Sequence, residues 1–341
     1  MRFTLAPMAV IITALSLAGA ADAQAYKAPR NAFGQPDFSG VWTNASLTNL
    51  VRPAQFKTAT IPEAQARAIE QGRARAVAAQ SRPTDPKLGA PASGQDPGGY
   101  NNFWTDPGAT LGRISGEVRT SWIVDPADGQ LPYTPSGKKL MDDTLYKARN
   151  TFDGPEARPL GERCILGFGS TAGPPMLNVL YNNNYQIQQA KDAVVIVVEM
   201  NHDARIIRLT DRKHPKDAIR QWMGDSFGWW EGDTLVVETT NFQPGESLRP
   251  YFGNSIFISM GGKVTERFTR ISAGQILYEF QVDDPTVYSK PWKAQMPLNA
   301  SKGPVYEYAC HEGNYALPGI LGGARRAEAE GRKPEEVGLG E

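Results

Sequence analysis

The sequence lacks the features by which several classes of protein are recognised. It has two cysteines and three histidines among 341 residues, and its 36 acidic residues balance 36 basic ones. A chain without net charge sets up no long-range field that attracts nucleic acid or an anionic membrane surface. A glycine-rich loop of the P-loop or Rossmann type is also missing, which disfavours nucleotide-dependent chemistry, and there is no Cys-x-x-Cys pair. We therefore expect no nucleic-acid partner and no cofactor.

Long hydrophobic runs are absent after the N-terminus, since no later apolar stretch approaches the roughly 18 residues of a membrane-spanning helix. The N-terminus itself has Met1-Arg2, a short apolar run and small residues before Ala23 or Ala25. This is the pattern of a secretory signal peptide. We predict a signal peptide over residues 1–23, no membrane span, and a mature protein that is periplasmic or secreted.

Cysteine is scarce but even in number, with Cys164 and Cys310 as the pair. Exported proteins fold in oxidising compartments, so we expect a disulfide between them. Two free buried thiols are the alternative. A catalytic thiol is a third interpretation, disfavoured because no helix start or adjacent base accompanies Cys164.

What the sequence does contain is strong β patterning in its C-terminal half. Short β-rich runs separated by turn residues are predicted at 185–189, 193–199, 205–209, 228–230, 234–242, 264–271, 275–282 and 290–296. Short Gly-containing connections such as Glu231-Gly232-Asp233 favour antiparallel neighbours. Ile276, Tyr278 and Phe280 alternate with more polar residues, which predicts one apolar face. The predicted fold is mainly β: an antiparallel meander that closes into a barrel or a curved sheet.

Two peripheral helices and long loops complete the predicted domain, residues 24–321. Residues 60–80 are rich in helix formers with Pro62 near the first turn, and residues 136–149 follow with Ser136 as the cap. Proline, glycine and asparagine dominate residues 81–112, which predicts a long loop. Residues 114–124 are predicted as a strand, and residues 322–341 as a polar C-terminal tail.

Long motifs give the chain a resemblance to a known family. They comprise the opening Asp37-Phe38-Ser39-Gly40-Val41-Trp42 and residues 181–186, 199–207, 219–225, 229–242 and 306–315. On these motifs the chain resembles a large family of exported bacterial proteins of unassigned function. The resemblance implies export and a shared site for the motifs, and it implies no activity. The Gly40-Val41-Trp42 element and the meander also look like lipocalin-like barrels, in which the tryptophan closes the barrel floor.

Titratable residues gather within these motifs. His202 follows an apolar strand, which places it at a barrel mouth where ligands enter, and Asp203 or Glu199 would fix its tautomer. His311 directly follows Cys310 and would be held by the disulfide. We therefore predict His202, Asp203, Glu199 and His311 as catalytic acid–base residues. Structural, hydrogen-bonded histidines are the alternative.

A metal site is not predicted, because Glu199-x-x-His202 lacks the helical HExxH form. His214 lies in a charged turn and is expected to be exposed and inert. Acidic residues recur inside the strands, at Glu199, Glu238, Glu266, Glu279 and Glu307. Strands are depleted of such residues, so each faces solvent or pairs in a polar cavity with Arg205, Arg220 or Arg267.

Aromatic and polar residues of the same motifs would line a pocket for a hydrophobic or aromatic molecule. The predicted substrate-binding residues are Asn183, Tyr185, Arg205, Arg220, Trp222 and Trp230. The alternative for the aromatic members is that they belong to the core. Arg220 would either pair with Asp225 or hold a substrate carboxylate.

Three functions remain open from the sequence. The leading one is an exported, cofactor-independent enzyme, a lyase, isomerase or hydrolase, that acts by acid–base chemistry on a small hydrophobic or aromatic molecule. The second is a lipocalin-like carrier that binds a similar ligand unchanged. The third is an envelope interaction protein whose loop, residues 81–112, docks a partner.

Overall fold

The computed structural model describes residues 26–82, 87, 89, 105–167, 173–244, 248–251 and 254–332. The predicted signal peptide lies outside these ranges, as does most of the predicted loop 81–112. Within them no helix has the length and apolar character needed to cross a membrane.

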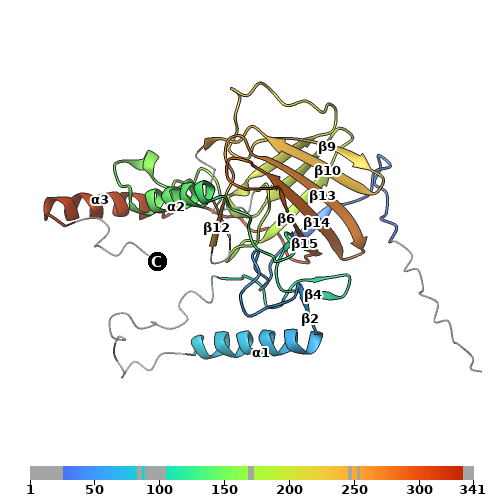
Figure 1. Ribbon diagram of the computed structural model, residues 1–341, viewed down its shortest axis with the longest axis horizontal. Coiled ribbons are helices and arrows are strands. Elements are labelled where there is room, and N and C mark those ends of the chain that lie inside the picture. Colours follow the sequence, from blue (N-terminus) through green and yellow to red (C-terminus); the bar gives the residue numbers. More distant parts are fainter. Residues whose placement is uncertain are drawn as a thin grey trace, which may run out of the picture.

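A closed barrel of nine strands dominates the fold, as the β patterning predicts (Figure 1). Its strands in spatial order are β1 (Gly40–Thr43), β6 (Asn184–Gln189), β7 (Ala193–Val198), β8 (Ala204–Arg208), β9 (Asp225–Glu231), β10 (Thr234–Thr240), β13 (Lys263–Ser272), β14 (Gln275–Asp283) and β15 (Trp292–Ala300). β1 pairs with both β6 and β15, and this second pairing closes the barrel. The prediction of a barrel is therefore confirmed.

One pairing departs from the predicted antiparallel meander. β8 and β9 run parallel, and only Ile207 with Ser226 and Arg208 with Phe227 are in register. A parallel pair cannot be joined by a tight hairpin, so the chain between Arg208 and Asp225 crosses over outside the barrel. The closing pair of β1 and β15 is equally short, with Trp42 opposite Ala300 and Thr43 opposite Asn299.

The inward side chains fill the barrel. On β14 the alternation read from the sequence is confirmed, because Ile276, Tyr278, Phe280 and Val282 are buried and their neighbours are partly exposed. Each fully buried large apolar side chain contributes about 1.5–3 kcal/mol, which makes this packed interior the main source of stability. Trp42 is buried, donates from Nε1 to the carbonyl of Phe38 at 2.8 Å, and lies 5.5 Å from the Arg270 guanidinium carbon.

Smaller sheets flank the barrel. They are formed by β2 (Thr60–Ile61), β3 (Arg113–Ile114) and β4 (Glu117–Arg119) in one sheet and by β11 (Leu248–Tyr251) and β12 (Asn254–Phe257) in another, while β5 (Ile123–Asp125) pairs with β15. The predicted single strand over 114–124 is wrong, since Ser115 and Gly116 both adopt positive φ and turn the chain between β3 and β4.

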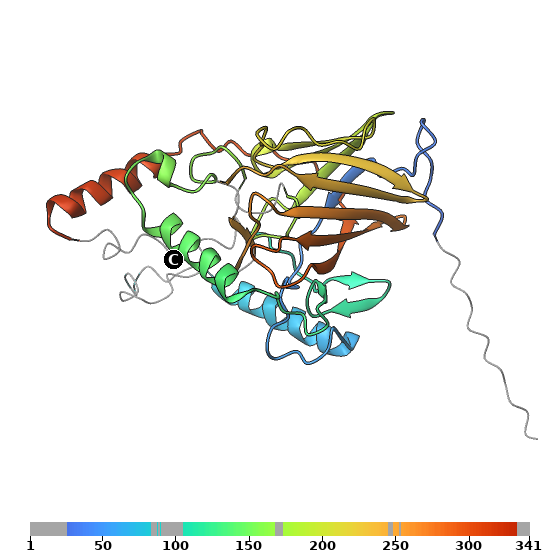
Figure 2. The same ribbon diagram turned by 45° about the horizontal axis from the view of Figure 1, so that its top comes forward.

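In the described part of the chain, three helices lie outside the barrel: α1 (Glu63–Gln80), α2 (Pro135–Asn150) and α3 (Ala316–Ala329). In Figures 1 and 2, α1 runs beneath the small sheet of β2 and β4, whereas α2 and α3 extend to one side of the barrel. The predicted helices correspond to α1 and α2, although the cap of α2 is Thr134, which accepts from Gly137 N at 2.9 Å, and not Ser136. The third helix, α3, occupies part of the predicted C-terminal tail. The described residues also include two short 3-10 turns, η2 (Pro155–Ala157) and η3 (Met200–His202).

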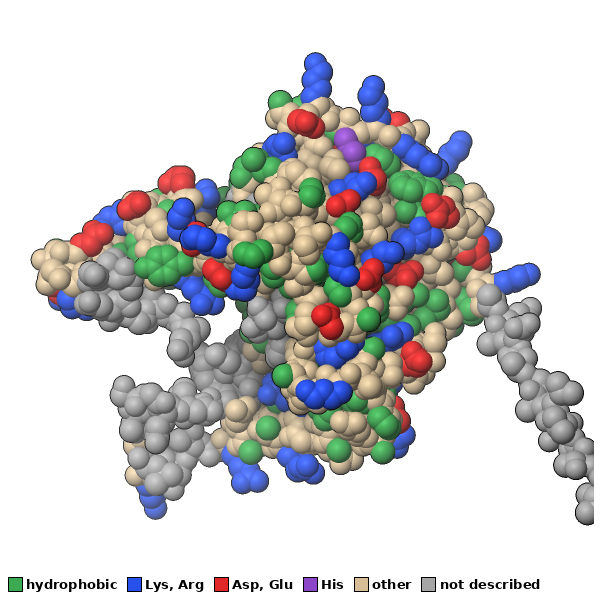
Figure 3. Space-filling view, in the orientation of Figure 1, with side chains coloured by type: hydrophobic (Ala, Val, Ile, Leu, Met, Phe, Trp, Pro, Cys, Tyr) green, Lys and Arg blue, Asp and Glu red, His purple; other side chains and the backbone are tan. Residues whose placement is uncertain are grey.

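On the face shown in Figure 3, acidic and basic side chains are interspersed across the middle of the barrel. This distribution matches the zero net charge of the sequence.

Candidate functional site

A cavity of about 670 Å³ opens where β8 and β9 diverge. The parallel ladder begins only at Ile207 and Ser226, so the start of β8 and the chain leading into β9 are separated. The lining residues are Ile165, Leu166, Asp203, Ala204, Arg205, Ile206, Arg208, Arg220, Gln221, Trp222, Met223, Gly224, Asp225 and Ser226. Small-molecule sites are typically about 300–1,000 Å³, so this cavity has the size of one.

Four predicted site residues meet at this cavity: Asp203, Arg205, Arg220 and Trp222. Asp203 and Arg205 come from the motif at residues 199–207, and Arg220 and Trp222 come from the motif at residues 219–225. The other predicted residues do not line the cavity.

Asp203 is the titratable group whose environment stands out. It follows η3, where Asn201 and His202 adopt left-handed φ of 60° and 55° and reverse the chain between β7 and β8. The Asp203 carbonyl accepts from Val198 N at 2.7 Å, and its carboxylate accepts from Gly167 N at 2.9 Å. Burial raises the pKa of Asp203 to about 6, against the opposing effects of the Gly167 N–H and of His202. A carboxyl group with this pKa exchanges protons near neutral pH.

Asp225 is a second carboxylate in the cavity wall, and it belongs to a chain of charged groups. Its Oδ2 accepts from Arg208 Nη2 at 2.7 Å and lies 2.8 Å from His214 Nδ1. The other ring nitrogen, Nε2, is 3.4 Å from an oxygen of Glu238, whose second oxygen is 3.6 Å from Lys263 Nζ. The prediction that His214 is exposed is wrong, since its side chain is 18% exposed and lies between the carboxylates of Asp225 and Glu238.

This network was not visible in the sequence. Glu238 reaches His214 only because β10 pairs with β9, which places Glu238 opposite Phe227, and the ring of Phe227 packs on His214 with centroids 4.5 Å apart. The charged turn that contains His214 gave no indication of this contact, which depends on sheet pairing between segments distant in the sequence.

Arg220 and Trp222 bring a cation and an aromatic surface to the cavity. The predicted ion pair of Arg220 with Asp225 does not form. Instead Arg220 Nη1 donates to the carbonyls of Phe242 at 3.2 Å and Met260 at 3.0 Å. Within the described chain no carboxylate lies within salt-bridge distance of Arg220. Trp222 is 37% exposed, and Ile206 on the opposite wall is 62% exposed, so the mouth presents apolar surface beside this cation.

Arg205 is buried and forms an ion pair inside the barrel. Its guanidinium forms a two-pronged pair with Glu266, with Nη1–Oε1 at 2.9 Å and Nη2–Oε2 at 2.5 Å. Tyr278 donates its hydroxyl proton to Glu266 at 2.7 Å and accepts from Met176 N at 3.0 Å. The expectation of a strand glutamate paired with Arg205 in a polar environment is thus met at Glu266. Arg205 therefore supports the cavity wall from inside the barrel.

The predicted catalytic residues His202 and Glu199 hold the C-terminal segment. His202 Nε2 accepts from Tyr308 N at 2.9 Å, and Glu199 Oε1 accepts from Tyr306 N at 3.1 Å. Glu199 is buried and also accepts from Asn184 Nδ2 at 2.8 Å. These contacts match the alternative of structural hydrogen-bonded groups, and the catalytic role of His202 stays a prediction.

The disulfide between Cys164 and Cys310 is confirmed, with Cα atoms 5.6 Å apart. It fixes the same C-terminal segment to the loop that supplies Ile165 and Leu166 to the cavity. His311 is exposed, and no described hydrogen bond occupies its ring.

Three predicted binding residues are part of the framework. Asn183 uses its side chain to bridge Val179 N, Val179 O and Asp106 O at 2.9–3.1 Å. Tyr185 is fully buried, its hydroxyl accepts from Asn44 Nδ2 at 3.1 Å, and burial raises its pKa above the ordinary range. Trp230 stacks on Phe38 with ring centroids 5.6 Å apart. None of the three lines the cavity.

Ser226 lies in a Gly-x-Ser-x-Gly sequence, Gly224-Asp225-Ser226-Phe227-Gly228, the spacing of a hydrolase nucleophile elbow. The structure places it within β9 and not at a strand-to-helix turn. Its Oγ is 2.8 Å from Thr239 Oγ1, and it alternates with Asp225 and Phe227, the residues that contact His214. Successive strand residues point to opposite faces, so serine and histidine are on opposite sides of the sheet.

Across the described ranges, no three His, Cys, Asp or Glu side chains are placed as a metal-ion site. The chain matches no protein-family model, no curated protein and no solved structure.

Proposed function

We propose that the cavity between β8 and β9 is the active site of a cofactor-independent enzyme that works by acid–base chemistry. The observation that carries this proposal is Asp203, a half-buried carboxyl group with a pKa of about 6 in the wall of a ligand-sized cavity. Catalytic acids and bases are tuned toward the working pH in this way, because the group must both take up and release a proton.

The cavity favours a substrate with an apolar or aromatic body and one anionic group. Trp222, Met223 and Ile206 supply apolar surface. Three arginines line the cavity. Arg205 is paired with Glu266 and Arg208 with Asp225, whereas Arg220 forms no ion pair with a carboxylate of the described residues. A carboxylate on the substrate would accept from the free side of this guanidinium and fix the body over Trp222.

The proton transfer would occur at Asp203. Above pH 6 its carboxylate would remove a proton from the substrate, and below pH 6 the protonated form would donate one. Gly167 N–H holds one carboxylate oxygen, which orients the group toward the ligand. Such chemistry fits a lyase, an isomerase or a hydrolase, and a positioned acid–base group contributes about 10²–10⁴-fold to rate.

The side of the cavity formed by β9 would supply a fixed negative charge, at Asp225, and a route for protons. Asp225 is held by Arg208 and by His214, whose second nitrogen faces Glu238. An imidazole between two carboxylates can accept a proton at one nitrogen and release one at the other. His214 would therefore connect the cavity wall to the partly exposed Glu238.

A carrier is the second candidate. The observation that favours it is the exposed apolar surface of Ile206 and Trp222 at the cavity mouth, which binding alone would use. A carrier needs no titratable group, so its affinity would not change through pH 6. The third function, partner docking by residues 81–112, concerns a segment that lies mostly outside the described residues and stays a prediction.

Export belongs to the proposal as well. The disulfide between Cys164 and Cys310 supports folding in an oxidising compartment. Sequencing the N-terminus of the protein recovered from the periplasm should show cleavage near Ala23 or Ala25. An uncleaved Met1 terminus in the cytoplasmic fraction would contradict export.

The decisive experiment compares Asp203→Asn with wild type on a panel of aromatic and alicyclic carboxylates. Calorimetry should detect binding to both proteins, because Arg220 and Trp222 are intact. Turnover, followed by mass change or isotope exchange from deuterated water, should fall by about 10²–10⁴-fold in the variant.

Two controls complete this test. Arg220→Met should weaken binding of carboxylates but not of their methyl esters, and Asp143→Asn, the same change at an exposed carboxylate of α2 outside the cavity, should leave turnover unchanged. If Asp203→Asn retained wild-type turnover, the proposed role of Asp203 would be wrong. Binding without turnover in wild type would favour the carrier.

A further inference from the structure

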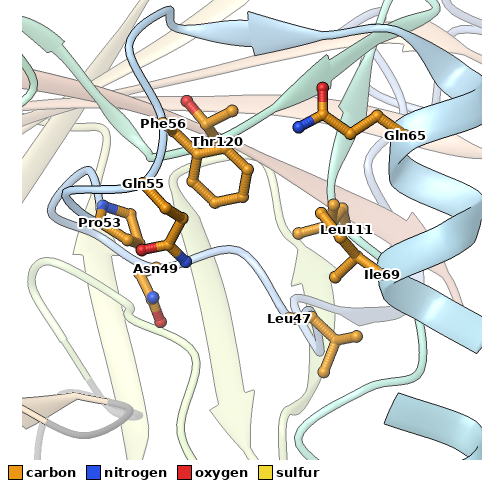
Figure 4. Close-up of a pocket in the computed structure, with 9 residues that line it drawn as sticks. All are labelled: Leu47, Asn49, Pro53, Gln55, Phe56, Gln65, Ile69, Leu111 and Thr120. Carbon is orange, nitrogen blue, oxygen red and sulfur yellow. The ribbon is translucent and has the colours of Figure 1, made fainter. Parts of the chain in front are cut away.

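A second cavity, of about 360 Å³, lies between α1 and the chain that connects β1 to β2 (Figure 4). Gln65 and Ile69 reach it from α1, Phe56 and Gln55 face them from the connecting chain, and Leu111 closes one side. Asn49, Pro53, Thr120 and Leu47 complete the lining. It shares no residue with the cavity between β8 and β9.

The lining carries no charged side chain. Arg113 of β3 is already paired with two carboxylates of α1, contacting Glu63 at 2.9 Å and Glu70 at 2.9 Å. A charged ligand would therefore lose its hydration without gaining a counter-charge, which is costly. This cavity selects an uncharged molecule.

Apolar groups form most of the surface. Ile69 and Leu111 lie next to each other in Figure 4, and the ring of Phe56 lies across the cavity from them on the connecting chain. Leu111 and Ile69 belong to the small hydrophobic cluster that holds α1 to the sheet of β2, β3 and β4. An aromatic face offers an apolar ring a stacked or edge-on partner.

Three of the four polar side chains that line the cavity are of one chemical kind. Asn49, Gln55 and Gln65 present primary amides, and no described hydrogen bond occupies these side chains. The hydroxyl of Thr120 is already used, donating to Thr58 O at 2.6 Å. Each primary amide offers both a donor and an acceptor, so amides pair best with a group that has both.

We propose that this cavity is a binding site for a small uncharged molecule that joins an apolar ring to an amide group. The ring packs against Phe56 and Ile69, and the amide exchanges hydrogen bonds with Gln55 and Asn49. This site is independent of acid–base chemistry at Asp203, so either assignment stands without the other.

Ligand-observed saturation-transfer NMR tests the proposal with benzamide as the probe. Benzamide should receive saturation from the protein, and benzoate, which has the same shape with a negative charge, should not compete with it. Methyl glucoside, which has hydroxyls but no amide or flat apolar ring, should not compete either. Competition by benzoate or by the glucoside would overturn the assigned ligand class.

Variants locate the site. Gln65→Trp on α1 places a large ring in the cavity and should abolish the benzamide signal, whereas Ala68→Trp adds the same side chain at an exposed α1 position that does not line the cavity. Gln55→Ala should weaken binding at least threefold without filling space. Trp222→Ala, in the other cavity, should leave the signal unchanged.

Circular dichroism of each variant verifies that the fold is retained. A benzamide signal that survives Gln65→Trp and Gln55→Ala, or that disappears in Trp222→Ala, would place the molecule elsewhere and overturn the proposal. Because benzamide carries no carboxylate, these outcomes are separate from turnover at Asp203.

Discussion

The carboxyl group of Asp203 ties stability to pH. Its folded-state pKa of about 6 lies above 3.8, the ordinary pKa of an aspartate side chain, so the native state binds more protons than the unfolded state between these two pH values. Stability should therefore fall as pH rises from 4 to 6 and then level off. Asp203→Asn removes this loss while keeping an oxygen to accept from Gly167 N–H.

The measurement is urea unfolding of wild type and Asp203→Asn at several pH values. As the pH rises from 4 to 6, the free energy of unfolding of the variant should increase by about 1–2 kcal/mol relative to that of wild type. This expected change is smaller than the full pKa shift implies, because the Asp203 side chain is partly exposed to solvent. A constant difference across this range would show that Asp203 titrates at its ordinary pKa.

The pair of Arg205 and Glu266 is the residue-scale contact with the largest expected effect. Both side chains are buried, at 1% and 0% exposure. Glu266→Gln leaves an uncompensated guanidinium inside the barrel, and we expect a loss of about 3–5 kcal/mol in the free energy of unfolding. Replacing both, as Arg205→Met with Glu266→Leu, should recover most of that loss. Denaturant midpoints measure the loss in the single variant and the recovery in the double variant. If the two variants were equally unstable, the buried unpaired charge would not be the cause of the loss.

His214 provides a third test at this scale. His214→Gln keeps a polar side chain but removes the connection between Asp225 and Glu238. On the proposed route for protons, turnover should fall by about tenfold or more and be partly restored by imidazole in the buffer, because small bases replace a missing acid–base group. A fall in turnover that imidazole does not restore would assign His214 a structural role.

Side-chain positions were predictable where periodicity alone decides them. Alternation along β14 gave the inward set of Ile276, Tyr278 and Phe280. Contacts between distant segments were not predictable, as His214 shows, because they depend on which strands pair. The same reason explains why Asn183 and Trp230 fit a binding motif in the sequence but serve the framework in the structure.

Helices and strands were predicted correctly where the local sequence pattern was strong. α1 and α2 appear close to their predicted bounds, and all eight predicted β runs contain a strand. The segment 114–124 was apolar enough to suggest one strand, but Ser115-Gly116 supplies the positive φ that a tight turn needs. The parallel pairing of β8 with β9 has no local signal, since it depends on how a long connection returns to the barrel.

The disulfide links the loop that supplies Ile165 and Leu166 to the cavity with the C-terminal segment. Cys164→Ser with Cys310→Ser should lower the free energy of unfolding by about 4–5 kcal/mol in the chain-entropy model, given a sequence separation of 146. Urea unfolding measures the loss, and chemically reduced wild type should match the variant. An unchanged midpoint would mean that the hydrogen bonds of Tyr306 and Tyr308 hold the segment unaided.

At the scale of the whole molecule, the single barrel sheet divides at its two shortest pairings into two antiparallel parts, called here the first and the second sheet. One contains β1, β6, β7 and β8, and the other contains β9, β10, β13, β14 and β15. The second sheet is one stretch of chain whose barrel strands follow one another, whereas β1 ends at Thr43 and its partner β6 begins at Asn184. Local pairings form faster than those that close long loops.

We therefore expect the second sheet to form first. Pulse-labelled hydrogen exchange during refolding should protect amides of β13 and β14 before those of β1. Val41→Pro on β1 should slow the late phase and leave the early one unchanged. Simultaneous protection of β1 and β14 would show that the barrel forms in a single step.

The two sheets meet at only two junctions, and each junction has two residue pairs in register. Because so few hydrogen bonds join β8 to β9, this pairing is the place where the barrel can open locally. β8 and β9 can separate while every antiparallel ladder stays intact, so opening there costs far less than global unfolding. The rate at which a ligand enters or leaves the adjacent cavity would then be governed by this local opening, with the rest of the barrel as a rigid frame.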